Sequence, residues 1–107
     1  MKKAMVCVAG FAIIVVVGIA VYSAEPSVDH GKEVYAAQKC MMCHSIAGAG
    51  NKMHTLDGIG SKMKADEIKK FVINPKAAKP DISMRAYADL PEKDLDDLVA
   101  YLMTLKK

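Results

Sequence analysis

Two cysteines and a histidine lie within five consecutive residues, Cys40-Met41-Met42-Cys43-His44. Cysteines at this spacing can each add to one vinyl group of a porphyrin, so that two thioether bonds form. The histidine after the second cysteine is then held against the iron and supplies one axial nitrogen. The C-x-x-C-H pattern therefore predicts one covalently attached haem c, with Cys40 and Cys43 as attachment residues and His44 as an iron ligand.

A cysteine pair is compatible with other functions, because short motifs recur by chance. In a thiol–disulfide oxidoreductase the pair begins a helix beside a strand. Here the pair follows a predicted helix, and the sequence shows no strand pattern. A zinc knuckle needs a second cluster of ligands, and the sequence has no convincing one. Haem attachment is therefore the favoured interpretation.

The first 24 residues have the pattern of a targeting segment. Two lysines precede an uncharged run over residues 4–22, and Ser23-Ala24 then offers small residues for cleavage. We expect residues 1–24 to be a signal peptide. Because the uncharged run is nearly long enough to cross a bilayer as a helix, an uncleaved N-terminal membrane anchor is the alternative. In both cases residues 25–107 form a periplasmic domain, either free or anchored to the outer face of the inner membrane.

The domain itself is nearly neutral and poor in aromatic side chains. The chain has 15 Lys/Arg and 12 Asp/Glu, a formal net charge of +3, and two of the lysines but no acid precede residue 25. The remaining residues therefore carry a net charge of about +1, which does not favour a nucleic-acid-binding protein. The chain has no Trp, and domains this small often need a cofactor to complete their core. The composition and the C-x-x-C-H motif therefore both favour a domain that contains a haem.

Apolar periodicity predicts an all-α domain. Ser27 is placed as the N-cap of the first helix, and Asn74-Pro75 ends the second. Pro91 suits the first position of the last helix, whose apolar face is rich in leucine. We predict helices over residues 28 to about 40, about 66 to 73, and from 91 to the end of the chain, with an irregular glycine-containing loop over 45–64 and an ordered loop over 75–88.

The residue at the sixth position of the iron determines the function, and a methionine there raises the reduction potential. Met84 is favoured because it lies in a loop between two predicted helices, four residues after Pro80, which restricts the backbone. His54 and Met63 remain alternatives. His30 is expected to face solvent. The full set of candidates in the domain is His30, Met41, Met42, Met53, His54, Met63, Met84 and Met103.

From about Val28 to Leu105 the chain resembles the class I c-type cytochromes, which are small monohaem proteins. The most specific shared features are the C-x-x-C-H motif and the Met84 loop ahead of a final helix. The resemblance implies a cytochrome c-like fold around one haem, with His44 and Met84 as its axial ligands. It also implies that the first and last helices pack together through a glycine and an aromatic, a pattern matched by Gly31, Tyr35, Leu98 and Tyr101.

The chain departs from this family at two places. The family often has Gly-Pro ahead of a leucine in the long loop, where a backbone carbonyl orients the iron-binding histidine. This chain has Met53-His54-Thr55-Leu56 there, and any residue offers a carbonyl. The family also commonly has a proline after the ligand methionine, where this chain has Arg85. We expect a looser loop, with Arg85 as a candidate partner for a haem propionate.

These features predict a one-electron carrier and no enzyme activity, because an iron with two axial ligands has no open position for a substrate. The partners would be respiratory complexes or other exported cytochromes, in transient contacts. The alternative is a five-coordinate haem domain that binds a small ligand or acts as a sensor. Lysines near the haem edge would either steer acidic partners or only solvate the surface; they are Lys39, Lys52, Lys62 and Lys79.

Overall fold

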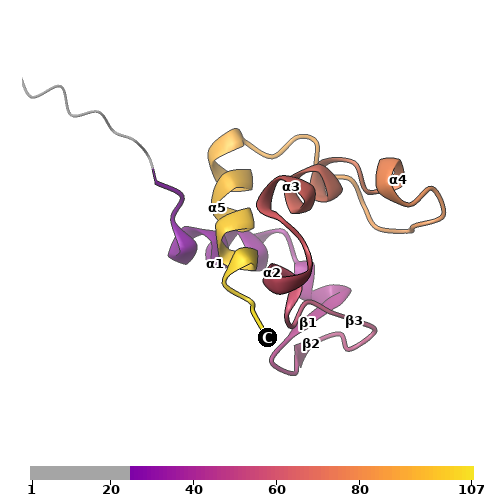
Figure 1. Cartoon of the computed structure of the whole chain (residues 1–107), viewed down its shortest axis with the longest axis horizontal. Helices are drawn as coiled ribbons and strands as arrows, with labels where there is room; N and C mark the ends of the chain where they lie inside the picture. The colour runs from indigo at the N-terminus through magenta and orange to yellow at the C-terminus, as the bar shows by residue number, and fades with distance from the viewer. Residues whose placement is uncertain (1–24) are drawn as a thin grey trace, which may run out of the picture.

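The computed structural model describes residues 25–107 (Figure 1). The segment predicted to be a signal peptide or an anchor, residues 1–24, lies outside the described residues. Within the described part, no helix has both the length and the apolar character needed to cross a bilayer.

The first helix, α1 (Val28–Ala37), begins at a side-chain cap and ends at a left-handed residue. Ser27 is the N-cap, as predicted, and its Oγ accepts a hydrogen bond of 3.1 Å from the backbone N–H of His30. The helix ends earlier than predicted because Lys39 has a backbone φ of 57°, which a helix cannot continue. The chain then turns into η1 (Cys40–Met42), a single 3₁₀ turn.

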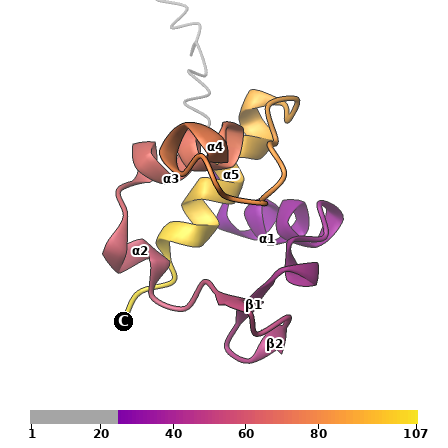
Figure 2. The same ribbon diagram turned by 90° about the vertical axis from the view of Figure 1, so that its right-hand side faces the viewer.

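Helix α1 packs across the last helix, α5 (Glu92–Met103), as both views show (Figures 1 and 2). Gly31 lies at the crossing, where a Cβ would come within 2.1 Å of the Asp97 carbonyl oxygen. One turn further along α1, Tyr35 meets Tyr101 edge to face, with ring centroids 5.9 Å apart. The predicted packing of the two helices through a glycine and an aromatic is therefore confirmed.

Helix α5 also contacts α2 (Ile59–Lys62) and α3 (Ala65–Ile73). The second predicted helix corresponds to α3, which ends before Asn74 as expected. Apolar residues of α1, α3 and α5 form the core of the domain. Its buried members are Val34, Tyr35, Ile68, Val72, Leu95, Leu98, Val99 and Leu102.

The prediction of a domain without strands is wrong in one detail, since a small sheet follows the cysteine turn. Strand β1 (His44–Ile46) pairs antiparallel with β2 (Ala49–Gly50) and parallel with β3 (His54–Thr55), in the order β2-β1-β3. Alternation of polar and apolar residues is recognisable only over about 4–8 residues. Strands of two or three residues therefore leave no such pattern.

Two short helices lie in segments predicted as loops. Helix α2 lies within residues 45–64, and α4 (Pro75–Ala78) lies within residues 75–88. Each has four residues, hardly more than one turn, so neither develops an apolar stripe. Pro75 occupies the first turn of α4, where its missing N–H costs nothing.

Asp97 of α5 is a buried carboxylate that binds the start of α1. It is 1% exposed. Its Oδ1 accepts a bond of 2.8 Å from the Ser27 N–H, while Oδ2 lies 2.7 Å from His30 Nδ1 and 2.8 Å from Lys93 Nζ. His30 is therefore half-buried and bonded to Asp97, in contrast to the expectation that it faces solvent. The bonds from Lys93 and from Ser27 hold the pKa of Asp97 at about 2, below its ordinary 3.8.

Replacing Gly31 with alanine should destabilise the domain by about 1–3 kcal/mol, the usual cost of overpacking a tight contact. The atom that the new methyl group would meet is a backbone carbonyl, which cannot rotate away. Thermal unfolding followed by circular dichroism measures the loss. Glu33→Ala, on the exposed face of the same helix, is the control and should unfold like the wild type. A Gly31→Ala variant of unchanged stability would contradict the close crossing.

Asp97→Asn should lower the stability of the fold at neutral pH and make that stability less dependent on pH below about pH 4. Because the folded-state pKa of about 2 lies below the ordinary 3.8, the carboxylate stabilises the fold above about pH 4, and this contribution is lost as the pH falls toward 2. The stability difference between wild type and variant, measured by urea titration, should therefore shrink over this range. Asp89→Asn changes an exposed acid and should follow the wild type. A difference that stays constant from pH 4 to pH 2 would refute the assignment.

Candidate functional site

The turn η1 presents both cysteines of the motif. The backbone N–H of Cys43 donates a bond of 3.2 Å to the Cys40 carbonyl, which closes the turn. Side chains three residues apart in a 3₁₀ turn lie on the same side, so this geometry directs both sulfur atoms to one side. Cys40 is half-buried against the core, Cys43 is exposed, and both are free thiols. The fold thus brings the two predicted attachment residues together.

The environment of Cys40 does not favour thiol chemistry. Burial raises the pKa of its thiol to about 11. A cysteine that attacks disulfides instead needs a lowered pKa, so that the thiolate is populated. Cys40 is therefore not suited to be the attacking thiol of a thiol–disulfide oxidoreductase.

His44, the first residue of β1, is held by the main chain of β3. Its Nδ1 lies 3.0 Å from the carbonyl oxygen of His54. Because a carbonyl oxygen only accepts, Nδ1 carries the proton and Nε2 is left with a free lone pair. Burial lowers the pKa of the His44 imidazole, which keeps the ring neutral, as a metal ligand must be. Although this chain lacks the Gly-Pro of the family it resembles, a backbone carbonyl, that of His54, still orients the histidine.

Strands β2 and β3 are tied to the cysteine turn by the loop between them. The Asn51 backbone N–H donates to the Met41 carbonyl at 2.9 Å, and its side chain donates to the Met42 carbonyl at 3.0 Å. Gly50 has a φ of 104°, and a Cβ there would come within 2.3 Å of the His44 carbonyl oxygen. The sequence analysis did not identify Asn51. The only signal was the neighbouring Gly50, because a glycine is needed where the backbone comes this close to the His44 carbonyl.

Met84 lies on a separate segment, the loop between α4 and α5. Both views place this loop above the strands β1–β3 (Figures 1 and 2). Met84 is half-buried and lines an open cleft of about 390 Å³. The cysteines and His44 are thus adjacent in the chain and held by η1 and β1, whereas Met84 comes from a distant part of the sequence. The other residues that line the cleft are Asn74, Pro75, Lys76, Ser83, Arg85 and Ala86.

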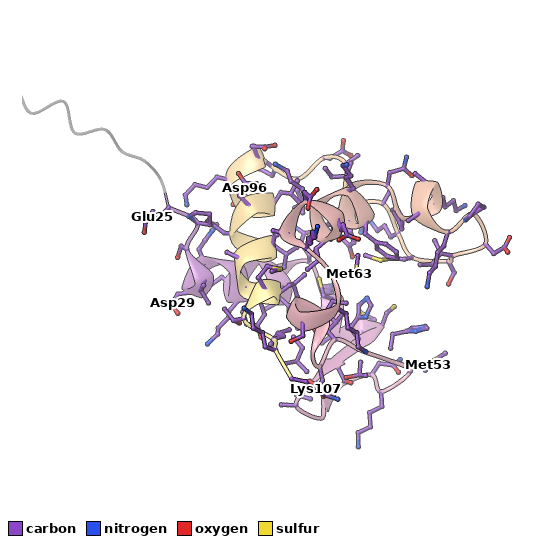
Figure 3. The ribbon with its side chains drawn as sticks, viewed as in Figure 1. Glu25, Asp29, Met53, Met63, Asp96 and Lys107 are labelled. Atoms are coloured by element: carbon purple, nitrogen blue, oxygen red, sulfur yellow. The ribbon has the colours of Figure 1, made fainter. Side chains whose placement is uncertain are left out.

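The two alternative ligands are in different surroundings. His54 is exposed and pairs with His44 in the parallel β1–β3 ladder. Met63, which Figure 3 labels, is half-buried and packs against the hydrophobic core. By contrast, Met53 is 77% exposed, and Figure 3 shows it at the periphery of the molecule.

Tyr35 carries a buried hydroxyl group that has no hydrogen-bond partner among the described residues. Burial, followed by the nearby Cys40 thiol, raises the pKa of this hydroxyl to about 12. An unpaired buried donor costs about 1–3 kcal/mol, so its presence beside Cys40 indicates a missing neighbour. Two free thiols on one turn, a neutral imidazole with a free Nε2 and this unpaired hydroxyl together fit a haem attached at Cys40 and Cys43.

Tyr87 is a residue of this region that the sequence analysis did not identify. It packs against the core, and its backbone N–H donates a bond of 2.9 Å to the Val72 carbonyl. Burial raises the pKa of Tyr87, the Cys40 thiol raises it further, and Arg85 opposes the rise. The distance of three residues between Tyr87 and Met84 was the only signal available in the sequence.

Comparison with known proteins agrees with this arrangement. The family model described as cytochrome c matches residues 28–106. Cytochrome c oxidase subunit 2 of Alkalihalophilus pseudofirmus is 25% identical over 91 residues, which cover 77% of this chain and 27% of that protein. The chain therefore corresponds to only part of that relative. Because the family match covers most of the chain, the protein belongs to the cytochrome c family and has a cytochrome c-like fold.

Proposed function

We propose that this protein is a one-electron carrier with one haem c, attached through Cys40 and Cys43 and bound at the iron by His44 and Met84. The bound haem would supply an iron that alternates between the ferric and ferrous states. The observation that carries the proposal is the orientation of His44, whose Nδ1 is bonded to a main-chain carbonyl beside two free thiols. That bond leaves Nε2 as the only ring nitrogen available to a metal.

Met84 is the ligand that the surroundings of the candidates favour. His54 is paired beside His44 in the sheet, so it lies next to the first ligand. Met63 would have to leave its contacts with the core in order to bind a metal. Met84 instead lies in a loop and lines an open cleft. Its sulfur could therefore move to a metal without breaking contacts of the hydrophobic core.

A site with two protein ligands supports electron transfer and no catalysis. His44 and Met84 would both bind the iron, so a substrate could bind there only after one of them had left. A thioether ligand also stabilises the reduced state and raises the potential. A five-coordinate haem domain, the alternative function, would require that Met84 be absent from the iron.

The surface around the cysteine turn suits a transient partner with acidic groups. Met42 and Met53 are 66% and 77% exposed there, and the only charged residues between positions 34 and 56 are Lys39 and Lys52, both exposed. Exposed apolar side chains beside two lysines favour short contacts with an acidic protein surface, although the Asp57 carboxylate, which accepts from the Ala47 N–H, adds one negative charge to this region. We propose respiratory complexes or other exported redox proteins as partners, a choice supported by the similarity to a protein named cytochrome c oxidase subunit 2.

We further propose that the domain works outside the cytoplasm. The charged and apolar pattern of residues 1–24 supports export. If these residues remained attached as an anchor, they would confine the carrier to the membrane surface and raise its effective concentration near fixed complexes.

Met84→Ala should remove the weak far-red band that a sulfur–iron bond gives in the oxidised protein. The measurement is a visible and near-infrared spectrum of protein produced in a periplasm. Met63→Ala is the matched control and should keep the band, because Met63 packs against the core. A high-spin spectrum that Met84→Ala leaves unchanged would exclude Met84 as the ligand and favour the five-coordinate alternative.

His54→Ala should leave the haem content and the low-spin spectrum unchanged. The acceptor for His44 Nδ1 is the backbone carbonyl of residue 54, which an alanine also provides. His44→Ala, measured in parallel by pyridine haemochrome and absorption spectra, should lose the low-spin spectrum. If His54→Ala lost it as well, the imidazole and not the main chain would be the group that matters.

A further inference from the structure

The segment that carries Met84 is weakly attached to the rest of the domain. Among residues 25–107, residues 83–86 make no hydrogen bond through backbone or side chain. Ser83, Arg85 and Ala86 are exposed, and only Met84 is half-buried. Before this stretch the last fixed point is Ile82, whose N–H donates to the Lys79 carbonyl at 3.0 Å. That bond stays within the segment after α4, whereas the first bond from this loop to a core helix lies on the C-terminal side of Met84.

Tyr87 is the first residue after Met84 that is fixed to the core. Its N–H donates to the carbonyl of Val72, a buried residue of α3. Its side chain packs against the core. Tyr87 thus connects the loop to α3 through the main chain and to the core through its ring.

Arg85 lies over the ring of Tyr87. The central carbon of its guanidinium group is 5.2 Å from the ring centroid, within the range of a cation–π interaction. No carboxylate among the described residues forms an ion pair with Arg85. The contact with the ring spans Ala86 and joins the residue after Met84 to the fixed Tyr87.

We propose that the Arg85–Tyr87 stack positions Met84, so that the two residues keep the methionine at the iron against competing ligands. This inference rests on the proposed His44/Met84 ligation. Neither residue touches the iron in this proposal, and both act through the backbone of the loop. Arg85 thereby supplies by a side-chain contact some of the restraint that a proline would supply through its ring.

The consequence can be measured as competition at the iron. Imidazole added to the oxidised holoprotein must displace Met84 before it binds. We expect the stack to form only while Met84 is bound, so that it stabilises the Met84-bound state. A variant without the stack loses this stabilisation, and its apparent affinity for imidazole should rise by the corresponding factor. An exposed cation–π contact corresponds to an increase of about two- to fivefold.

The test compares imidazole titrations of holoprotein variants, followed by the far-red band. Arg85→Gln and Tyr87→Leu should each bind imidazole about two- to fivefold more tightly. Tyr87→Phe keeps the ring and should behave as the wild type. The double variant should show no further gain from Arg85→Gln once the ring is lost, because the two residues act as one unit.

The chain offers a matched control in a second stack of the same kind. Lys32 Nζ lies 5.9 Å from the ring centroid of Tyr101, at the α1–α5 contact. Lys32→Gln removes a cation–π contact of similar strength away from the Met84 loop. It should leave the imidazole affinity unchanged, even if it lowers the thermal stability slightly.

The outcomes separate this inference from the proposed function. If Met84→Ala keeps the far-red band, the ligand assignment is wrong and the positioning role is wrong with it. If Met84→Ala loses the band but Arg85→Gln and Tyr87→Leu bind imidazole like the wild type, the ligation stands and the positioning role fails. Equal gains for Lys32→Gln and Arg85→Gln would also overturn it, because the effect would then follow general stability.

Discussion

The crossing of α1 and α5 at Gly31 is the contact on which the position of the site depends. The absence of a side chain lets the Asp97 carbonyl come as close as it does, and the side chain of the same Asp97 binds the N–H of Ser27, the N-cap of α1. One residue of α5 thus holds α1 at two points, through its main chain and through its carboxylate. Because a helix is stiff, fixing its first two turns against α5 also fixes its last turn. Cys40 follows that turn, so the proposed attachment site is placed by contacts made at the other end of the helix.

The sheet β1–β3 adds the restraints on the site that the helix crossing does not provide. The chain leaves α1 through the left-handed Lys39. The turn that follows needs hydrogen bonds of its own, because the cysteines and His44 would otherwise move with it. Asn51 provides this restraint through its two bonds to the carbonyls of Met41 and Met42. The β1–β3 pairing then sets the carbonyl of His54 against the imidazole of His44. The strands are too short to add much to the core, and their effect is to orient one side chain.

The parts of this arrangement that could be predicted from the sequence are those with a long or repeated pattern. The periodic face of α5 and the spacing of the C-x-x-C-H motif each involve several residues that point to one conclusion. The strands and the short helices leave no such pattern, because each is only two to four residues long. The burial of His30 could not be foreseen either, since it depends on Asp97, which lies 67 positions away in the sequence. Local patterns predict elements, whereas the pairing of polar groups between distant elements requires the structure.

The two sides of the proposed iron site are held with unequal strength, and this difference bears on function. His44 belongs to a hydrogen-bonded sheet and is oriented by a backbone carbonyl, so its release requires that the β1–β3 pairing be broken. Met84 lies in a stretch whose nearest bond to a core helix is that from the Tyr87 N–H to the Val72 carbonyl. An electron carrier must keep both ligands in both oxidation states, whereas a ligand-binding haem protein needs one position that opens. With the proposed ligation, the difference between these two functions would be set by the Met84 loop and by the contacts that restrain a few of its residues.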